Sequence, residues 1–133
     1  TSNADPGTKL AMAEHLHVWG VKKENDMEKL LQVLNDFEVP HTFYDYRDNP
    51  PEDDRLNRWA QYLDQDYPIN GRSTLWKKSE RMFMRLELPE RMEWLRKHYH
   101  VLERPIVEDE NFEVLIMGAR PERILKELCN IRL

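Results

Sequence analysis

Hydrophobic and polar positions alternate in four short stretches of the chain, and this alternation predicts strands. The first stretch, His15–Trp19, is followed by Gly20, and the second is His41–Tyr46. The other two stretches, Pro105–Asp109 and Phe112–Met117, are separated by a tight polar turn. Two strands joined in this way form an antiparallel hairpin, so we expect the last two strands to pair with each other.

Hydrophobic residues at helical spacing predict a helix between the first two strands. Its stripe consists of Met27, Leu30, Leu31, Leu34 and Phe37. Asn25 is the expected N-cap of this helix, with Glu28 three residues later as its capping-box partner. A strand, a helix and a strand with short connections predict that these two strands are parallel.

The middle of the chain, from about residue 50 to residue 102, predicts a helical insert. Its first helix begins after Pro50-Pro51, and two further helices are expected over Trp76–Leu88 and Pro89–Leu102. A last helix, Glu122–Leu128, follows Pro121 after the predicted hairpin. The order βαβ, helical insert, ββα predicts an α/β fold with a four-stranded mixed sheet and flanking helices.

The first eleven residues have the character of an expression-vector remnant. Ser2-Asn3-Ala4 resembles the residue of a cleaved tag, and residues 7–13 translate as restriction sites of a cloning polylinker. The expected native chain therefore runs over residues 12–133 and forms a single domain that contains the insert.

Composition and charge exclude several classes of protein. The chain has 20 basic and 25 acidic residues, a net charge of −5 and a pI near 5.6, which argues against general nucleic-acid binding. No stretch reaches the roughly 20 apolar residues of a membrane-spanning helix. A single cysteine, Cys129, cannot form an internal disulfide, so we expect a cytoplasmic protein.

The remaining side chains favour structural interpretations over cofactor chemistry. His15 and His17 share one strand face, but no third residue at suitable spacing joins them, so neither a metal nor a cofactor is expected. The basic residues of the insert are interpreted as a solvated face, with a macromolecular contact as the alternative. These residues are Lys77, Lys78, Arg81 and Arg85. We expect Met82, Met84, Met92 and Trp94 to pack the insert against the sheet.

Four stretches, in the same order along the chain, resemble the arsenate reductase (ArsC-like) family, which also contains the Spx regulators. They are VWGVK (18–22), INGRSTLWK (69–77), ERPIV (103–107) and GARPE (118–122). The resemblance implies a thioredoxin-like fold. It also implies that Arg72, Arg104 and Arg120 are candidate anion-binding residues and that the bond before Pro105 is cis.

The resemblance also implies where a catalytic cysteine would lie. Aligned on Gly20, the cysteine position falls on Glu24, to within about one residue, so the site is predicted to be degenerate and no catalytic residue is assigned. Glu24 either pairs with one of the three arginines or is simply solvated. Cys129, in or near the last helix, is expected to be a small apolar residue.

These features predict a non-catalytic binding or regulatory module whose ligand is a protein partner, a small anion or glutathione. Two alternatives stay open. One is a glutathione- or thiol-linked arsenate or disulfide reductase that uses a displaced or borrowed thiol. The other is a structural subunit that docks on a larger complex through the exposed insert.

Overall fold

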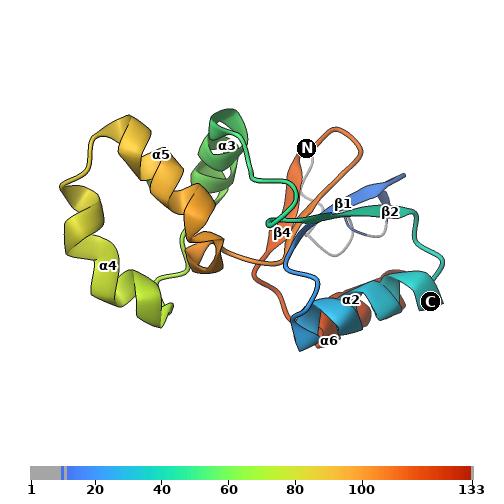
Figure 1. Ribbon diagram of the computed structural model, residues 1–133. Coiled ribbons are helices and arrows are strands. Elements are labelled where there is room, and N and C mark those ends of the chain that lie inside the picture. Colours follow the sequence, from blue (N-terminus) through green and yellow to red (C-terminus); the bar gives the residue numbers. More distant parts are fainter. Residues whose placement is uncertain (1–9, 11, 133) are drawn as a thin grey trace. The chain divides into compact units, whose positions relative to one another are not determined.

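The computed structural model describes residue 10 and residues 12–132, and the side chains of residues 129–132 lie outside that description (Figure 1). Contacts divide the chain into two compact units. We call Thr1–Asp45 with Arg104–Leu133 the sheet unit, and Tyr46–Glu103 the helical unit. Of the predicted vector remnant, only Leu10 is described, and it is buried in the core although the sequence interpretation set it aside.

Over the described residues from 14 onward, the sheet unit contains a four-stranded mixed sheet and two long helices, which confirms the predicted α/β order. The strands are arranged β2-β1-β3-β4; β1 is parallel to β2, and the other two pairs are antiparallel. The elements of this unit are β1 (Leu16–Gly20), α2 (Asn25–Asp36), β2 (His41–Asp45), β3 (Ile106–Glu108), β4 (Val114–Met117) and α6 (Pro121–Arg132).

The strand register brings the ends of three strands together on one side of the sheet, where β1 and β2 end and β3 begins. Gly20, the last residue of β1, pairs with Asp45, the last residue of β2. Trp19 pairs on its other side with Ile106, the first residue of β3. The loop that leaves β1, the end of β2 and the segment that enters β3 therefore meet on this side.

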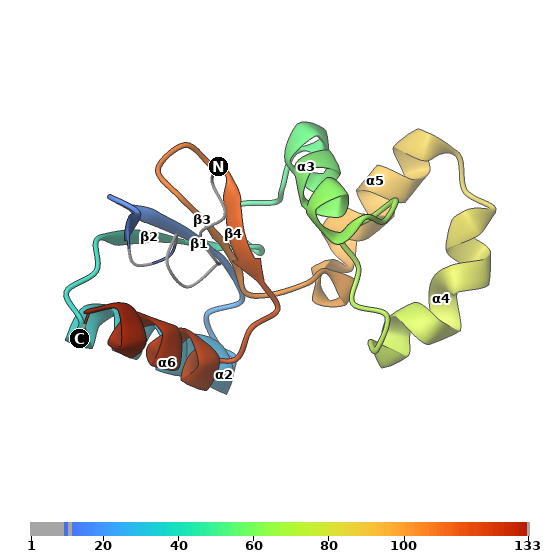
Figure 2. The same ribbon diagram turned by 180° about the vertical axis from the view of Figure 1, so that it is seen from behind.

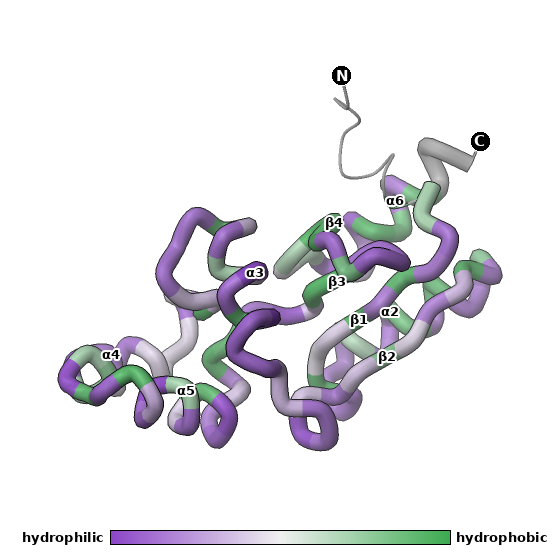
Figure 3. The backbone as a smooth tube through the Cα atoms, turned by 90° about the horizontal axis from the view of Figure 1, so that it is seen from above, coloured by the Kyte–Doolittle hydropathy of each residue, from purple (hydrophilic) through white to green (hydrophobic). Residues whose placement is uncertain are grey.

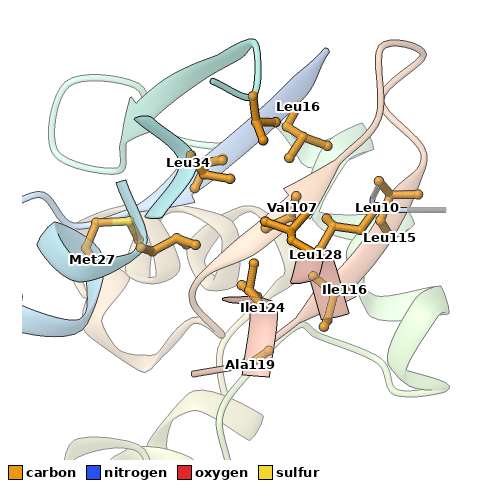
Figure 4. Close-up of a cluster of buried hydrophobic side chains, with 13 residues drawn as sticks. Leu10, Leu16, Met27, Leu34, Val107, Leu115, Ile116, Ala119, Ile124 and Leu128 are labelled. Carbon is orange, nitrogen blue, oxygen red and sulfur yellow. The ribbon is translucent and has the colours of Figure 1, made fainter. Parts of the chain in front are cut away.

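The core of the sheet unit lies between one face of the sheet and the helix pair α2 and α6, which run side by side (Figures 1 and 2). Leu16 of β1, Val107 of β3 and Ile116 of β4 point into it, and Met27 and Ile124 come from the helices (Figure 4). These positions alternate along the strands and recur at helical spacing, so the sequence pattern places them on the buried faces. Figure 3 shows hydrophobic stretches along β3, β4 and α6.

The opposite face of the sheet carries aromatic and polar side chains. Trp19 stacks on Tyr44 of β2 with ring centroids 4.3 Å apart, and His17 stacks on Phe112 at 4.1 Å. The Trp19 indole nitrogen donates to Glu108 Oε1 over 2.7 Å, and both side chains are buried. A buried carboxylate needs such a donor, because leaving it unpaired is costly.

The helical unit has a core of its own. It consists of α3 (Asp53–Leu63), α4 (Thr74–Met84), α5 (Leu88–Lys97) and a 3₁₀ turn, Tyr99–Val101. Its two ends meet, since the Tyr46 hydroxyl donates to the carbonyl oxygen of Glu103 over 2.8 Å. The largest fully buried side chains of this unit include Trp59, Phe83 and Leu95.

Several boundaries and one packing prediction of the insert are wrong. The two helices expected over residues 76–88 and 89–102 are α4 and α5, and the chain leaves the α-helix at His98 before the 3₁₀ turn. Met82 and Met84 are exposed, at 42% and 51%, instead of packed. Phe83, between them, occupies the buried face, so the methionines on either side of it turn toward solvent.

None of the described helices is long and apolar enough to cross a membrane.

Candidate functional site

Glu24 is the N-cap of α2, at the edge of the sheet where β1 ends. A turn in the loop places it there, with the Glu24 amide donating to the Val21 carbonyl oxygen over 3.2 Å. The Glu24 carbonyl oxygen then accepts the amides of Met27 and Glu28 at 3.1 Å. The prediction that Asn25 caps this helix is therefore wrong by one residue.

The Glu24 side chain does not cap the helix, because it pairs with Arg104. Arg104 Nε donates to Glu24 Oε1 over 2.6 Å, and Nη2 donates to Oε2 over 2.8 Å. Both carboxylate oxygens are thus held by one planar guanidinium group, the geometry that gives the strongest carboxylate–arginine pairs. The two side chains are partly shielded, with 36% of Glu24 and 22% of Arg104 exposed.

Arg104 reaches Glu24 from the segment that enters β3. The bond between Arg104 and Pro105 is cis. A Cβ atom added to Gly20 would lie 3.9 Å from Arg104 Cβ and 2.0 Å from the terminal methyl group of Met27. The distance to Arg104 is an ordinary van der Waals contact, whereas the distance to Met27 is an overlap, so the position of the Met27 side chain depends on a residue without a Cβ atom at position 20.

Asp45, a residue that the sequence interpretation treated only as part of a strand, supports the loop before Glu24. The amide of Lys22 donates to Asp45 Oδ2 over 3.1 Å, and Asp45 is 7% exposed. An aspartate at the last position of a strand, where it is buried, is the signal that sequence reasoning missed. Such a residue commonly binds the backbone of a neighbouring turn.

Of the other two candidate arginines, Arg120 shares the sheet unit with Glu24, and Arg72 does not. Arg120 lies in the sheet unit directly before α6, is exposed, and makes no ion pair among the described residues. Arg72 belongs to the helical unit, where its amide donates to Asn70 Oδ1 over 2.9 Å. Within the sheet unit, therefore, Glu24 is paired with Arg104 and not with Arg120.

The electrostatics of this site resemble those of an anion held at a helix N-terminus. The carboxylate of Glu24 lies at the positive end of the α2 dipole and beside a guanidinium group, and both stabilise negative charge there. The Glu24 carboxylate contains no sulfur, so it cannot undergo thiol chemistry. The single cysteine, Cys129, lies in α6, and its side chain is outside the described residues.

Metal ligation and deep cavities do not add to this site within the described residues. No group of three or more His, Cys, Asp and Glu side chains is arranged to hold a metal ion in that part of the chain. A hollow of about 300 Å³ lies beside α2 and α6, lined by Lys29, Val33, Pro121 and Leu125 among others. A second hollow, of about 360 Å³, lies in the helical unit beside Asp53 and Tyr67. Glu24 and Arg104 line neither hollow.

Sequence comparison identifies no relatives. No protein-family model matches the chain, and no curated protein sequence matches it significantly.

Solved structures, in contrast, share the architecture over most of the chain. An arsenate reductase from Vibrio cholerae superposes with a TM-score of 0.64 and 21% identity, covering 87% of this chain and 99% of that protein. An arsenate reductase (ArsC) related protein from Brucella melitensis gives a TM-score of 0.59 and 20% identity, covering 82% and 90%. The strand order, the helix pair and the position of the insert together with these superpositions show that the chain has the ArsC-like thioredoxin fold.

Proposed function

We propose that this protein belongs to the arsenate reductase family and is a non-catalytic binding or regulatory module. The observation that carries the proposal is the Glu24–Arg104 pair at the start of α2. The sequence resemblance aligns the family's cysteine with Glu24, and a carboxylate there cannot form a thiol adduct or a mixed disulfide.

The pair also argues against a free anion site. In the resembled family an arginine at this place binds an oxyanion or sulfur substrate. Here the Nε and Nη2 groups of Arg104 already donate to Glu24. A small anion or glutathione would have to displace a carboxylate held by two charge-assisted hydrogen bonds. We therefore favour a protein partner over a small anion or glutathione, in a cytoplasmic protein.

The alternative function is a glutathione- or thiol-linked arsenate or disulfide reductase that uses a displaced or borrowed thiol. The structures that share the fold favour it, since they include an arsenate reductase. Arg120 favours it as well, because its exposed guanidinium group has no ion-pair partner among the described residues and lies in the sheet unit. Cys129 is the one internal thiol that such a reaction could use.

A reductase assay separates the two functions. The purified protein is supplied with arsenate and reduced glutathione; in a second assay a small disulfide replaces arsenate and reduced glutathione stays as the electron donor. We expect turnover no faster than the protein-free reaction, and no change in the Cys129→Ala variant. Turnover that scales with protein concentration would contradict the proposal. Its loss in Cys129→Ala would identify a displaced thiol, and its survival a borrowed one.

A cysteine placed at position 24 tests the alignment itself. In a Cys129→Ala background, Glu24→Cys puts a thiol at the N-terminus of α2 and next to Arg104. Both features stabilise a thiolate, so we expect its pKa to fall below the ordinary value of about 8.5. The pH dependence of alkylation by iodoacetamide measures this pKa.

The matched control is Lys126→Cys in the same background, because Lys126 is exposed within α6. Its thiol should keep a pKa near the ordinary value. If the thiol at position 24 titrates at or above that of the control, position 24 does not activate a thiol, and the alignment that supports the proposal is wrong.

A further inference from the structure

The helix α4 presents an unpaired cationic face. Lys77, Lys78, Arg81 and Arg85 are all exposed, and within the described part of the chain none of their side chains makes an ion pair or a hydrogen bond. Four cations so close together repel one another. Their arrangement therefore costs stability unless something outside the described structure offsets it.

The spacing gathers these cations on one side of the helix. The inner side of α4 is fixed by Phe83, which is fully buried and makes edge-to-face contacts with Trp76 and Trp94 at 5.0 and 5.5 Å. At 3.6 residues per turn, Lys77, Lys78, Arg81 and Arg85 fall on the opposite side.

Exposed aliphatic side chains flank the cations. Leu75 and Met82, seven residues apart, border the cationic stripe on one side, and Met84 borders it on the other. They are 38%, 42% and 51% exposed. Hydrophobic and hydrophilic residues alternate along α4 in Figure 3. We call these seven residues, Leu75, Lys77, Lys78, Arg81, Met82, Met84 and Arg85, the α4 face.

The charge of this segment is opposite to that of the rest of the protein. Of the 20 basic and 25 acidic residues, five basic and one acidic fall within residues 72–85, which leaves 15 basic and 24 acidic elsewhere. A local positive field on an acidic protein attracts negatively charged partners to this one surface and repels them from most others.

We propose that the α4 face binds an acidic amphipathic segment of another protein. The carboxylates of such a segment pair with the four cations, and its apolar side chains cover Leu75, Met82 and Met84. Methionine side chains adapt to varied apolar partners, as docking surfaces require. This proposal goes beyond the proposed function, because it concerns a surface that shares no residue with the Glu24–Arg104 site.

The composition of the face favours protein over nucleic acid or lipid. Its exposed apolar residues are aliphatic, whereas single-stranded nucleic acids are bound by stacking on aromatic rings. An interfacial helix inserts a whole apolar face into lipid, but the apolar side of α4 is turned inward, where Phe83 is fully buried. Trp76 lies on the inner side of the helix and contacts Phe83 instead.

Fluorescence anisotropy with a defined probe tests the proposal. The probe is a fluorescein-labelled 16-residue peptide of Glu, Ala and Leu, with Leu at every third or fourth position. The wild-type protein should bind it, and raising NaCl from about 50 to 300 mM should weaken binding. A peptide with Lys in place of Glu should not bind.

Two variants with the same change in charge locate the contact. Lys78→Glu with Arg81→Glu reverses two charges of the face, and we expect at least tenfold weaker binding. Arg58→Glu with Lys126→Glu reverses two exposed charges on α3 and α6, and should weaken binding less than threefold. Leu75→Ser with Met82→Ser should weaken it several-fold at unchanged salt dependence. Unchanged circular dichroism and melting temperature verify that each variant is folded.

Other results would overturn the proposal. They are no binding of the acidic peptide, equal losses in the two charge-reversal variants, or tighter binding of a 20-base-pair DNA or of phosphatidylglycerol vesicles through the same residues. Self-association in sedimentation equilibrium that disappears on reversal at Lys78 and Arg81 would assign the face to a second copy of the chain. The reductase assay tests for thiol chemistry and involves no residue of the α4 face, so either proposal can fail without the other.

Discussion

At the scale of single residues, Glu110 shows how backbone amides act on a surface carboxylate. Amide donors, first that of Glu110 itself and then that of Glu14, hold the pKa of this carboxyl group below its ordinary value. The Glu14 amide lies 2.9 Å from Glu110 Oε1 and ties the segment before β1 to the β3–β4 turn. The unfolded chain lacks this arrangement, so folding favours the ionised form.

The pH dependence of stability follows from the sign of this shift. The contribution of Glu110 should be fully present above the ordinary value of 4.5 and should be lost as the pH falls through the lowered pKa. Glu110→Gln should therefore lower the urea midpoint at pH 7, and the difference from wild type should shrink toward pH 3. Glu113→Gln, on an exposed neighbour, is the control. An equal deficit at both pH values would contradict the assignment.

Single residues also show what the sequence could not predict. The resemblance directed attention to Glu24 and Arg104, but local patterns cannot show which arginine reaches a residue 80 positions away. The buried contacts of Asp45 and Glu108 were missed for the same reason, because both residues stand in strands that read as ordinary alternation. The one local signal of such a buried hydrogen bond is a polar residue at a strand position whose side chain is expected to be buried.

At the scale of elements, the junction of β1 and α2 is packed against a glycine. The terminal methyl group of Met27 occupies the space where a Cβ atom of residue 20 would lie, and Met27 is 2% exposed. Gly20 was expected to follow the first strand, and it is instead the last paired residue of β1. Its small size lets the first turn of α2 approach the sheet.

A methyl group at position 20 should disturb this junction. We expect Gly20→Ala to reduce the free energy of unfolding by about 1 kcal/mol, because the flexible end of Met27 must move within a packed core. Gly71→Ala is the matched control: no atom lies within 4 Å of its added Cβ, so its effect should stay within about 0.5 kcal/mol. Urea denaturation measures both.

A double variant shows whether Met27 is the cause. Gly20→Ala combined with Met27→Ala should cost less than the sum of the two single changes, by about 0.5 kcal/mol or more, because the shorter side chain makes room. Strict additivity would mean that the cost of Gly20→Ala arises elsewhere.

The order and type of elements could be predicted, and their ends could not. Alternation and helical spacing are properties of short segments, so the four strands and the helices around them follow from the sequence. Helix ends depend on what the capping groups meet in three dimensions, which is why the start of α2 differs by one residue and α5 ends before residue 102. Periodicity also defines a helical face without showing what covers it, as Met82 and Met84 demonstrate.

At the scale of the whole molecule, the protection of backbone amides from hydrogen exchange should differ between the strands of the sheet. β1 and β3 are bonded on both sides, whereas β2 and β4 are edge strands. We therefore expect the amides of β1 and β3 to exchange hydrogen more slowly than those of the edge strands. Hydrogen exchange followed by NMR measures this order, and equal protection across the four strands would contradict it.

The hydrogen bond from the Tyr46 hydroxyl to the Glu103 carbonyl oxygen marks where the chain leaves the sheet and returns to it. Because β2 and β3 are both paired to β1, and in opposite senses, the end of β2 and the start of β3 stand two strand spacings apart, about 10 Å. Four or five residues can bridge that gap. A linker of that length can therefore replace the intervening 58-residue helical unit without altering the connectivity of the strands. The same geometry allows the unit to be exchanged for the corresponding segment of another protein of this fold.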